Sequence, residues 1–345
     1  MNGYTDYLEL FELEKRKKLK RNFSRFFIAL FFYLLISYAV MLVLEAVILL
    51  KYGAEGAINI FNNTYFQWLL SVGPMYLIGF PVFLLIVLSM KSEKRERKKL
   101  KTGEFFSVLL ICQALTMLGS IIGSTVTGVI GSILGHDIGS QTTELIENSP
   151  LWLIFAVAVI LAPIIEELIF RKLLIDKLSR YGDRVAILVS GIAFGLFHGN
   201  FEQFFYAAML GMLFAFVYTK TGNVIHTVLL HMAVNLLGSV IALPVTRASY
   251  RIYDYMAGIY EYESMLQYTR DSMIVSSYSI LQYASVAAGV FIAVSALKSK
   301  KIQIPDNSKV YLKRGELAAG IFFNVGVILF LLFALLQFLL SVFFV

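Results

Sequence analysis

Cysteine is almost absent from this sequence, and charged residues are scarce. The single cysteine, Cys112, excludes an intramolecular disulfide and a cluster of thiolate metal ligands. Charged residues fill only 15% of the 345 positions, whereas hydrophobic residues fill 58% and the mean hydropathy is +0.74. This balance lies outside the range of soluble globular proteins. The sequence therefore predicts a chain whose main solvent is lipid, with no soluble domain.

Long apolar runs make up most of the chain instead. A segment of about 18 or more mostly apolar residues can cross the hydrocarbon core of a bilayer, which is roughly 30 Å thick. Such segments predict an all-α fold, a polytopic transmembrane bundle of eight or nine helices, because the short fifth and sixth runs can also be read as one bent hairpin. The nine predicted spans lie near residues 26–50, 65–90, 105–134, 150–170, 185–199, 203–219, 223–244, 273–297 and 317–345.

Lysine and arginine are concentrated in alternate connections between these spans. With the N-terminus in the cytoplasm, 26 of the 30 fall in predicted cytoplasmic segments, as the positive-inside rule requires. The net charge of +7 is then explained by topology, which argues against nucleic acid as a partner. The first apolar run is too long for the h-region of a cleavable signal peptide. We expect a multi-pass protein of the plasma membrane, with the lipid bilayer as a partner and a cytoplasmic N-terminus.

Ionisable side chains stand out in the fourth predicted span, because each costs roughly 2.5–3.5 kcal/mol to insert into a membrane. The run LAPIIEELIFRKLL places Glu166 and Glu167 after Pro163, which removes a backbone donor and predicts a kink. Glu167 and Arg171 are four residues apart, in the order that favours an ion pair. Because Glu166 lies about 100° around the helix from Glu167, it can face a cavity as a general base.

Two histidines and an asparagine supply further polar groups. The run FGLFHG places His198 four residues after Phe194, and HMAVN places His231 and Asn235 on one helical face. Together with a carboxylate, these groups can activate water and bind an oxyanion. His226 lies five residues before His231, about 140° away around the helix, and is interpreted as a packing residue.

The polar residues described above belong to three motifs on different predicted spans. The runs EELIFR at 166–171, FGLFH at 194–198 and HMAVN at 231–235 resemble, in order and spacing, the motifs of the type II CAAX prenyl protease and bacteriocin-processing family, also called the CPBP or Abi family. The resemblance covers about 150–240. It implies an intramembrane endopeptidase that hydrolyses a membrane-associated peptide or protein, either a prenylated CAAX protein or a bacteriocin or pheromone precursor.

The resemblance also implies roles for the matching residues. Glu166 would activate a water molecule that His198 positions. His231 and Asn235 would bind the developing oxyanion. The residues that would support this set are Glu167 and Arg171. Zinc is the alternative, with Glu166, His198 and His231 as ligands, but the His-Glu-x-x-His motif is absent and a mechanism without a cofactor is favoured.

The chain divides into three predicted parts. Residues 1–149 hold a basic cytoplasmic segment and three spans, 150–244 the four-helix catalytic core, and 245–345 a Tyr-rich outer segment and two further spans. Because tyrosine prefers the headgroup region, we expect 245–272 to lie on the outer leaflet as an interfacial helix or loop.

Depth in the membrane is at odds with the proposed site. On straight helices Glu166 falls near the cytoplasmic side and His198 near the outer end of its span. A kink at Pro163, strong tilts or misplaced span ends would reconcile the two positions.

Two functions other than proteolysis fit the same polar residues. One is a non-catalytic membrane scaffold, such as a bacteriocin-immunity protein that modulates a membrane partner. The other is a transporter with Glu166 and the histidines as a proton relay, which would need related halves with matching broken helices.

Overall fold

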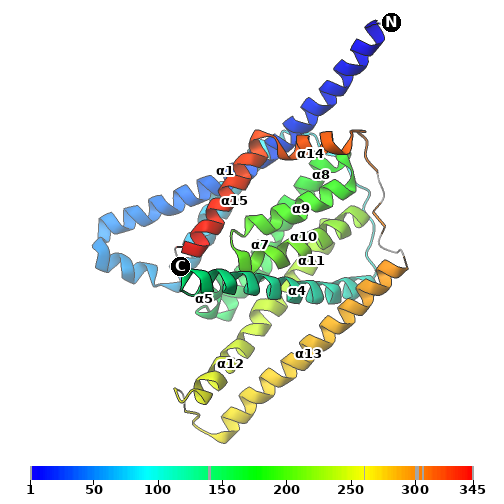
Figure 1. Cartoon of the computed structure of the whole chain (residues 1–345). Helices are drawn as coiled ribbons and strands as arrows, with labels where there is room; N and C mark the ends of the chain where they lie inside the picture. The colour runs from blue at the N-terminus through cyan, green and yellow to red at the C-terminus, as the bar shows by residue number, and fades with distance from the viewer. Residues whose placement is uncertain (1, 139–140, 260, 300–302, 305–306, 344–345) are drawn as a thin grey trace.

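The computed structural model describes residues 2–138, 141–259, 261–299, 303–304 and 307–343, and these residues form helices and their connections (Figure 1). Eight helical segments are long and apolar enough to cross a membrane: Leu10–Phe61, Thr64–Leu88, Thr102–Leu134, Leu151–Tyr181, Phe201–Thr221, Val224–Met256, Met265–Lys298 and Val325–Phe343. The predicted all-α transmembrane bundle is therefore confirmed. The predicted span 185–199 is helix α9 (Asp183–Phe197), which has only 15 residues and is too short to count among the eight.

The helices that precede the site lie on two sides of the bundle. They are α1 (Asn2–Phe61), α2 (Thr64–Gly73), the π-helical segment η1 (Pro74–Gly79), α3 (Phe80–Leu88), α4 (Thr102–Leu134) and α5 (Gln141–Glu147). Glycines on α4 allow close packing against the centre of the bundle. A Cβ atom at Gly119 would lie 2.4 Å from the Cα of Tyr206, and one at Gly123 would lie 2.7 Å from the carbonyl oxygen of Glu202. Both contacts require glycine, because a side chain would collide with backbone.

The centre of the bundle is one interrupted helix followed by three more helices. The interrupted helix comprises α6 (Leu151–Ile154), η2 (Phe155–Leu161), α7 (Ala162–Glu167), η3 (Leu168–Leu173), α8 (Leu174–Leu178) and the 3₁₀ turn η4 (Ser179–Tyr181). It extends eleven residues beyond the predicted end at 170. Then come α9, α10 (Phe201–Thr221) and α11 (Val224–Asn235), which continues through η5 (Leu236–Ile241) into α12 (Ala242–Met256).

The Tyr-rich segment 245–272, predicted to be an interfacial helix or loop, is largely helical. It forms the distal part of α12 and the start of α13 (Met265–Lys298), two long helices joined by a short connection and projecting together from the bundle (Figure 1). Arg251 of α12 holds the fully buried Asp271 of α13 through two hydrogen bonds of 2.7 and 2.9 Å. This ion pair ties α12 to α13, and the position of the segment on the outer leaflet stays a prediction. Residue 260 of the segment lies outside the described residues.

Connections that the charge pattern assigns to the cytoplasm meet at one end of the molecule, called here the basic end. The backbone amide of Glu93 donates to the carbonyl of Asp176, and that of Lys98 donates to Thr221. The amide of Lys309 donates to Arg180. One residue was wrongly included in the cytoplasmic count, because Arg171 is fully buried within the bundle.

The chain ends with α14 (Arg314–Phe322) and α15 (Val325–Phe343), which pack against α1 (Figure 1). Phe27 of α1 meets Phe330 of α15 with ring centroids 5.3 Å apart. A Cβ atom at Gly326 would lie 2.0 Å from the carbonyl oxygen of Ser24, so these helices also touch through backbone. The last predicted span, 317–345, is therefore two helices, of which only α15 is long enough to cross.

Candidate active site

The two glutamates lie between widened helical turns. In η2 the amide of Ala162 donates to the carbonyl of Val157, five residues back, and in η3 the amide of Leu174 donates to Ile169. Such π-helical turns occur often at functional sites. The predicted irregularity at Pro163 therefore takes the form of wide turns on either side of α7. These turns change the direction in which each following side chain points.

Glu167 is the best-connected residue of the site. Its carboxylate is fully buried, and its Oε1 lies 3.0 Å from Nδ1 of His231. Its Oε2 lies 3.1 Å from Nε of Arg171, so the ion pair predicted from the four-residue spacing is present. Thr227 of α11 is fully buried near the same carboxylate, and its hydroxyl donates to the carbonyl oxygen of Val224. Glu167 therefore ties the fourth span to α11.

Arg171 lies between two aromatic rings. Its guanidinium carbon is 4.5 Å from the centroid of Phe194 and 5.5 Å from that of Phe214. Its nitrogens make no hydrogen bond among the described residues, and the contact with Glu167 is one of charge. Cation–π attraction is strong for a desolvated guanidinium, up to about 2 kcal/mol or more. The two rings therefore hold the cation in place beside the carboxylate.

Glu166 differs from its neighbour in exposure and in partners. Its side chain is 15% exposed, whereas that of Glu167 is 0% exposed. Its Oε2 lies 3.7 Å from Nε2 of His231, so the imidazole bridges the two carboxylates, one with each ring nitrogen. With the proton on Nδ1, His231 donates to Glu167 and turns Nε2 toward Glu166. Glu166 keeps free oxygen lone pairs that can accept a proton.

His198 stands at the end of α9, close to the same rings. Its Nδ1 lies 2.9 Å from the carbonyl oxygen of Phe194, and its ring meets that of Phe194 edge to face at 4.9 Å. The Phe194 ring also meets the His231 ring at 5.6 Å. Both imidazoles thus contact the same phenyl group, and His198 is near enough to Glu166 for their charges to interact.

The predicted disagreement in depth came from a misplaced span end. The fourth span runs from Leu151 to Tyr181, so Glu166 lies 15 residues from either end, at the middle of the helix. It therefore lies at mid-helix, and His198 of α9 is near enough for the two charges to interact. The predicted end at 170 had placed Glu166 near the end of this helix.

Asn235 makes a contact that sequence spacing does not predict. It lies one turn beyond His231, as expected, but its Nδ2 donates a 2.8 Å hydrogen bond to the carbonyl oxygen of Ala158 in η2. In the π-helical pattern of η2, a carbonyl accepts from the amide five residues later, which for Ala158 is the amide of residue 163. Pro163 has no amide hydrogen. Asn235 therefore satisfies a carbonyl that the proline leaves without a backbone donor.

Two residues of the site were missed by sequence reasoning. Thr227 shares a helical face with His231 and Asn235 at four-residue intervals, a pattern that could have found it. Phe214 of α10 offered no such signal, although its ring lies 5.5 Å from that of His231.

The zinc alternative finds no support in the arrangement of the side chains. Across the described ranges, no group of three His, Cys, Asp or Glu residues is placed to hold a metal ion. In this arrangement Nδ1 of His231 faces Glu167, and Nδ1 of His198 lies 2.9 Å from a backbone carbonyl oxygen. These residues therefore do not fit the metal as they stand.

Comparison with known proteins matches the central part of the chain. Residues 148–237 match the family model described as type II CAAX prenyl endopeptidase Rce1-like, a range that includes all six predicted site residues. The chain is 27% identical over 222 residues to the "Putative membrane peptidase YdiL" of Bacillus subtilis, covering 59% of this chain and 86% of the relative. No solved structure matches the chain.

Two further relatives match shorter stretches. The membrane-embedded CAAX protease MroQ of Staphylococcus aureus is 26% identical over 174 residues, which is 47% of this chain and 68% of the relative. The UPF0177 protein YxdF of Lactococcus lactis is 32% identical over 80 residues, 23% of this chain and 44% of the relative.

Proposed function

The chain belongs to the Rce1-like family of CAAX-type membrane peptidases, and we propose that it is an intramembrane endopeptidase in which Glu166 activates the attacking water. The observation that carries this proposal is the position of His231, whose ring bridges a fully paired carboxylate, Glu167, and a partly exposed one, Glu166. Two adjacent carboxylates with such different surroundings suit different tasks.

Glu166 is the proposed general base. Its carboxylate accepts a proton from a water molecule as the water oxygen attacks the carbonyl carbon of the scissile peptide bond. His198 is near enough to Glu166 for their charges to interact and is proposed to orient that water. Glu167 keeps its charge for Arg171 and His231, so it does not compete for the proton.

The tetrahedral intermediate places a negative charge on the former carbonyl oxygen. His231 is the proposed donor to this oxygen through Nε2, which requires a ring protonated on both nitrogens while Nδ1–H stays bonded to Glu167. Asn235 has a second N–H available besides the one given to Ala158. When the C–N bond breaks, Glu166 returns its proton to the departing nitrogen, which leaves a carboxylate and an amine as products.

The proposed substrate is a membrane-associated peptide or protein, either a CAAX-type protein or a bacteriocin or pheromone precursor. We place the basic end of the molecule in the cytoplasm on the positive-inside rule. The substrate then has to reach a carboxylate at mid-span, so an extended segment that enters the bundle is required.

Cleavage of prenylated and leader-type peptides by the full-length protein in detergent tests this proposal. Glu166→Gln should lower the rate by about 10²–10⁴-fold, while size-exclusion behaviour and thermal unfolding stay those of the unmodified protein. Glu96→Gln, an exposed change at the basic end, is the matched control. Hydrolysis that survives Glu166→Gln would refute the role of Glu166, whereas no cleavage of any peptide by the unmodified protein would favour a scaffold.

A further inference from the structure

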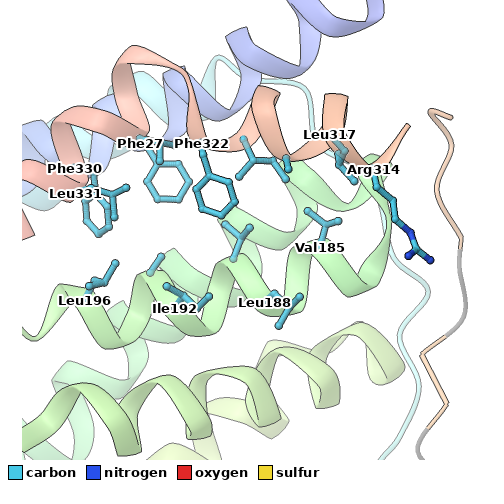
Figure 2. Close-up of a pocket in the computed structure, with 15 residues that line it drawn as sticks. Phe27, Val185, Leu188, Ile192, Leu196, Arg314, Leu317, Phe322, Phe330 and Leu331 are labelled. Atoms are coloured by element: carbon cyan, nitrogen blue, oxygen red, sulfur yellow. The ribbon is translucent and has the colours of Figure 1, made fainter. Parts of the chain in front are cut away.

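A second site lies on the far side of α9 from the catalytic residues. It is an apolar groove of about 280 Å³ between α9, the α14–α15 pair and Phe27 of α1 (Figure 2). Ile192 of α9 lines it, whereas Phe194, which packs against Arg171 and His231, points about 160° away around the helix. The groove and the catalytic site are therefore on opposite faces of one helix.

The groove has one charged end and an apolar length. Its wall on α9 runs from Val185 to Leu196, twelve residues or about 16 Å of helix. Arg314, the first residue of α14, stands at the Val185 end, as Figure 2 shows. That end adjoins the basic end, because Asp183 at the start of α9 is held by Asn307 and Arg95. The remaining lining is aliphatic or aromatic.

Arg314 is a cation without a partner in the described part of the chain. It is exposed and has no ion pair or side-chain hydrogen bond there. Glu316, the acidic residue of the same turn, is engaged by Arg16 at 2.5 Å and also accepts from the backbone of Lys313. The guanidinium is therefore free to meet an anion from outside the chain.

The dimensions of the groove select the occupant. A volume of about 280 Å³ spread over about 16 Å of helix gives a groove narrower than a helix of about 10 Å diameter. An extended hydrocarbon chain is narrower and fits. Leu188, Ile192 and Phe322 leave the groove open toward the surrounding lipid, since their side chains are partly exposed. Basic pockets between transmembrane helices on the cytoplasmic side bind anionic lipid head groups.

We propose that this groove binds one anionic glycerophospholipid, with an acyl chain along α9 and the head-group phosphate at Arg314. The charge of Arg314 matches the phosphate of such a lipid, and the apolar wall of about 16 Å along α9 matches its acyl chain. The proposal stands on the groove alone and does not depend on the proteolytic activity.

Native mass spectrometry of the full-length, delipidated protein tests the site. The protein is titrated with phosphatidylglycerol, with phosphatidylcholine of the same chains, or with a farnesylated peptide. We expect one tightly retained phosphatidylglycerol. Arg314→Gln should weaken its retention roughly fivefold, equivalent to about 1 kcal/mol for one basic residue. Lys99→Gln, which removes an unpaired exposed charge from the same end, should have no such effect.

A second variant tests where the chain lies. Ala318→Trp, at the edge of the groove, should reduce retention of phosphatidylglycerol, whereas Val325→Trp on the exposed side of α15 should not. Equal retention of phosphatidylcholine, equal effects of Arg314→Gln and Lys99→Gln, or full retention by Ala318→Trp would each overturn the proposal. Stronger retention of the farnesylated peptide would assign the groove to substrate instead.

Discussion

Asn235 donates a hydrogen bond to the carbonyl of Ala158, the oxygen that Pro163 leaves without a backbone partner. The bond joins α11 to the helix that carries the two glutamates, 77 residues away in sequence. The asparagine of the HMAVN motif thus has a structural task, whatever part it takes in catalysis. The two roles make different predictions.

A double-mutant cycle separates them. Asn235→Ala should lower the free energy of unfolding by about 1–3 kcal/mol, since it leaves a buried carbonyl unsatisfied. In a Pro163→Ala background the loss should be smaller, because residue 163 then offers an amide hydrogen to Ala158. Unfolding in detergent measures both values. An equal loss in the two backgrounds would show that the proline is not the cause, and activity that stays low despite restored stability would mark Asn235 as catalytic.

The buried pair of Glu167 and Arg171 should be costly to break from one side. Glu167→Gln should destabilise the protein by about 3–5 kcal/mol, since it leaves the guanidinium uncompensated between two phenyl rings. Glu167→Gln combined with Arg171→Met should recover part of this loss, because no buried charge then remains unpaired. Thermal unfolding of the three proteins measures the coupling. A double variant less stable than Glu167→Gln alone would contradict a simple ion pair.

A polar cavity in the membrane region should hold water. It has a volume of about 430 Å³ and lies between α4, η5 and α13, lined by Gln113, Ser120, Tyr278 and Gln282 among others. Polar groups in the bilayer are costly without hydrogen-bond partners. In vesicles, Ser120→Cys should therefore react with a water-soluble maleimide.

The same helix supplies both controls for this labelling. Native Cys112 is fully buried and should stay unlabelled, and Leu118→Cys, 49% exposed on the face outside the cavity, should react slowly because lipid disfavours the thiolate. Equal labelling at Leu118→Cys and Ser120→Cys would mean that the cavity is no wetter than the lipid-facing surface.

Acid should weaken one link at the basic end. The hydrogen bond from Lys309, 2.6 Å long, holds the pKa of the Glu93 carboxyl below its ordinary value of 4.5. A carboxyl with a lowered folded pKa contributes stability above its unfolded pKa and loses it as the pH falls through the folded pKa. The contribution should be below about 1 kcal/mol, because Lys309 is largely exposed. The free energy of unfolding should therefore fall less steeply between about pH 6 and pH 3 in Glu93→Gln than in the unmodified protein.

The sequence by itself determined the relationships that are local along the chain. Apolar length fixed the spans to within a few residues at most ends, and the four-residue spacing fixed the pairing of Glu167 with Arg171. The distribution of lysine and arginine also predicted which connections meet at the basic end. Each of these follows from helix geometry or from the cost of moving charge across lipid.

Only the tertiary structure decided the contacts between helices. Phe214 lies against Arg171, and Asn235 reaches Ala158, because three helices pack with particular rotations that no spacing specifies. The position of Glu166 along its helix also depended on where the fourth helix ends. Basic residues after position 170 had suggested an end there, whereas the helix continues to Tyr181. Side chains of one helix share a register set by the backbone, whereas neighbouring helices find theirs only through packing.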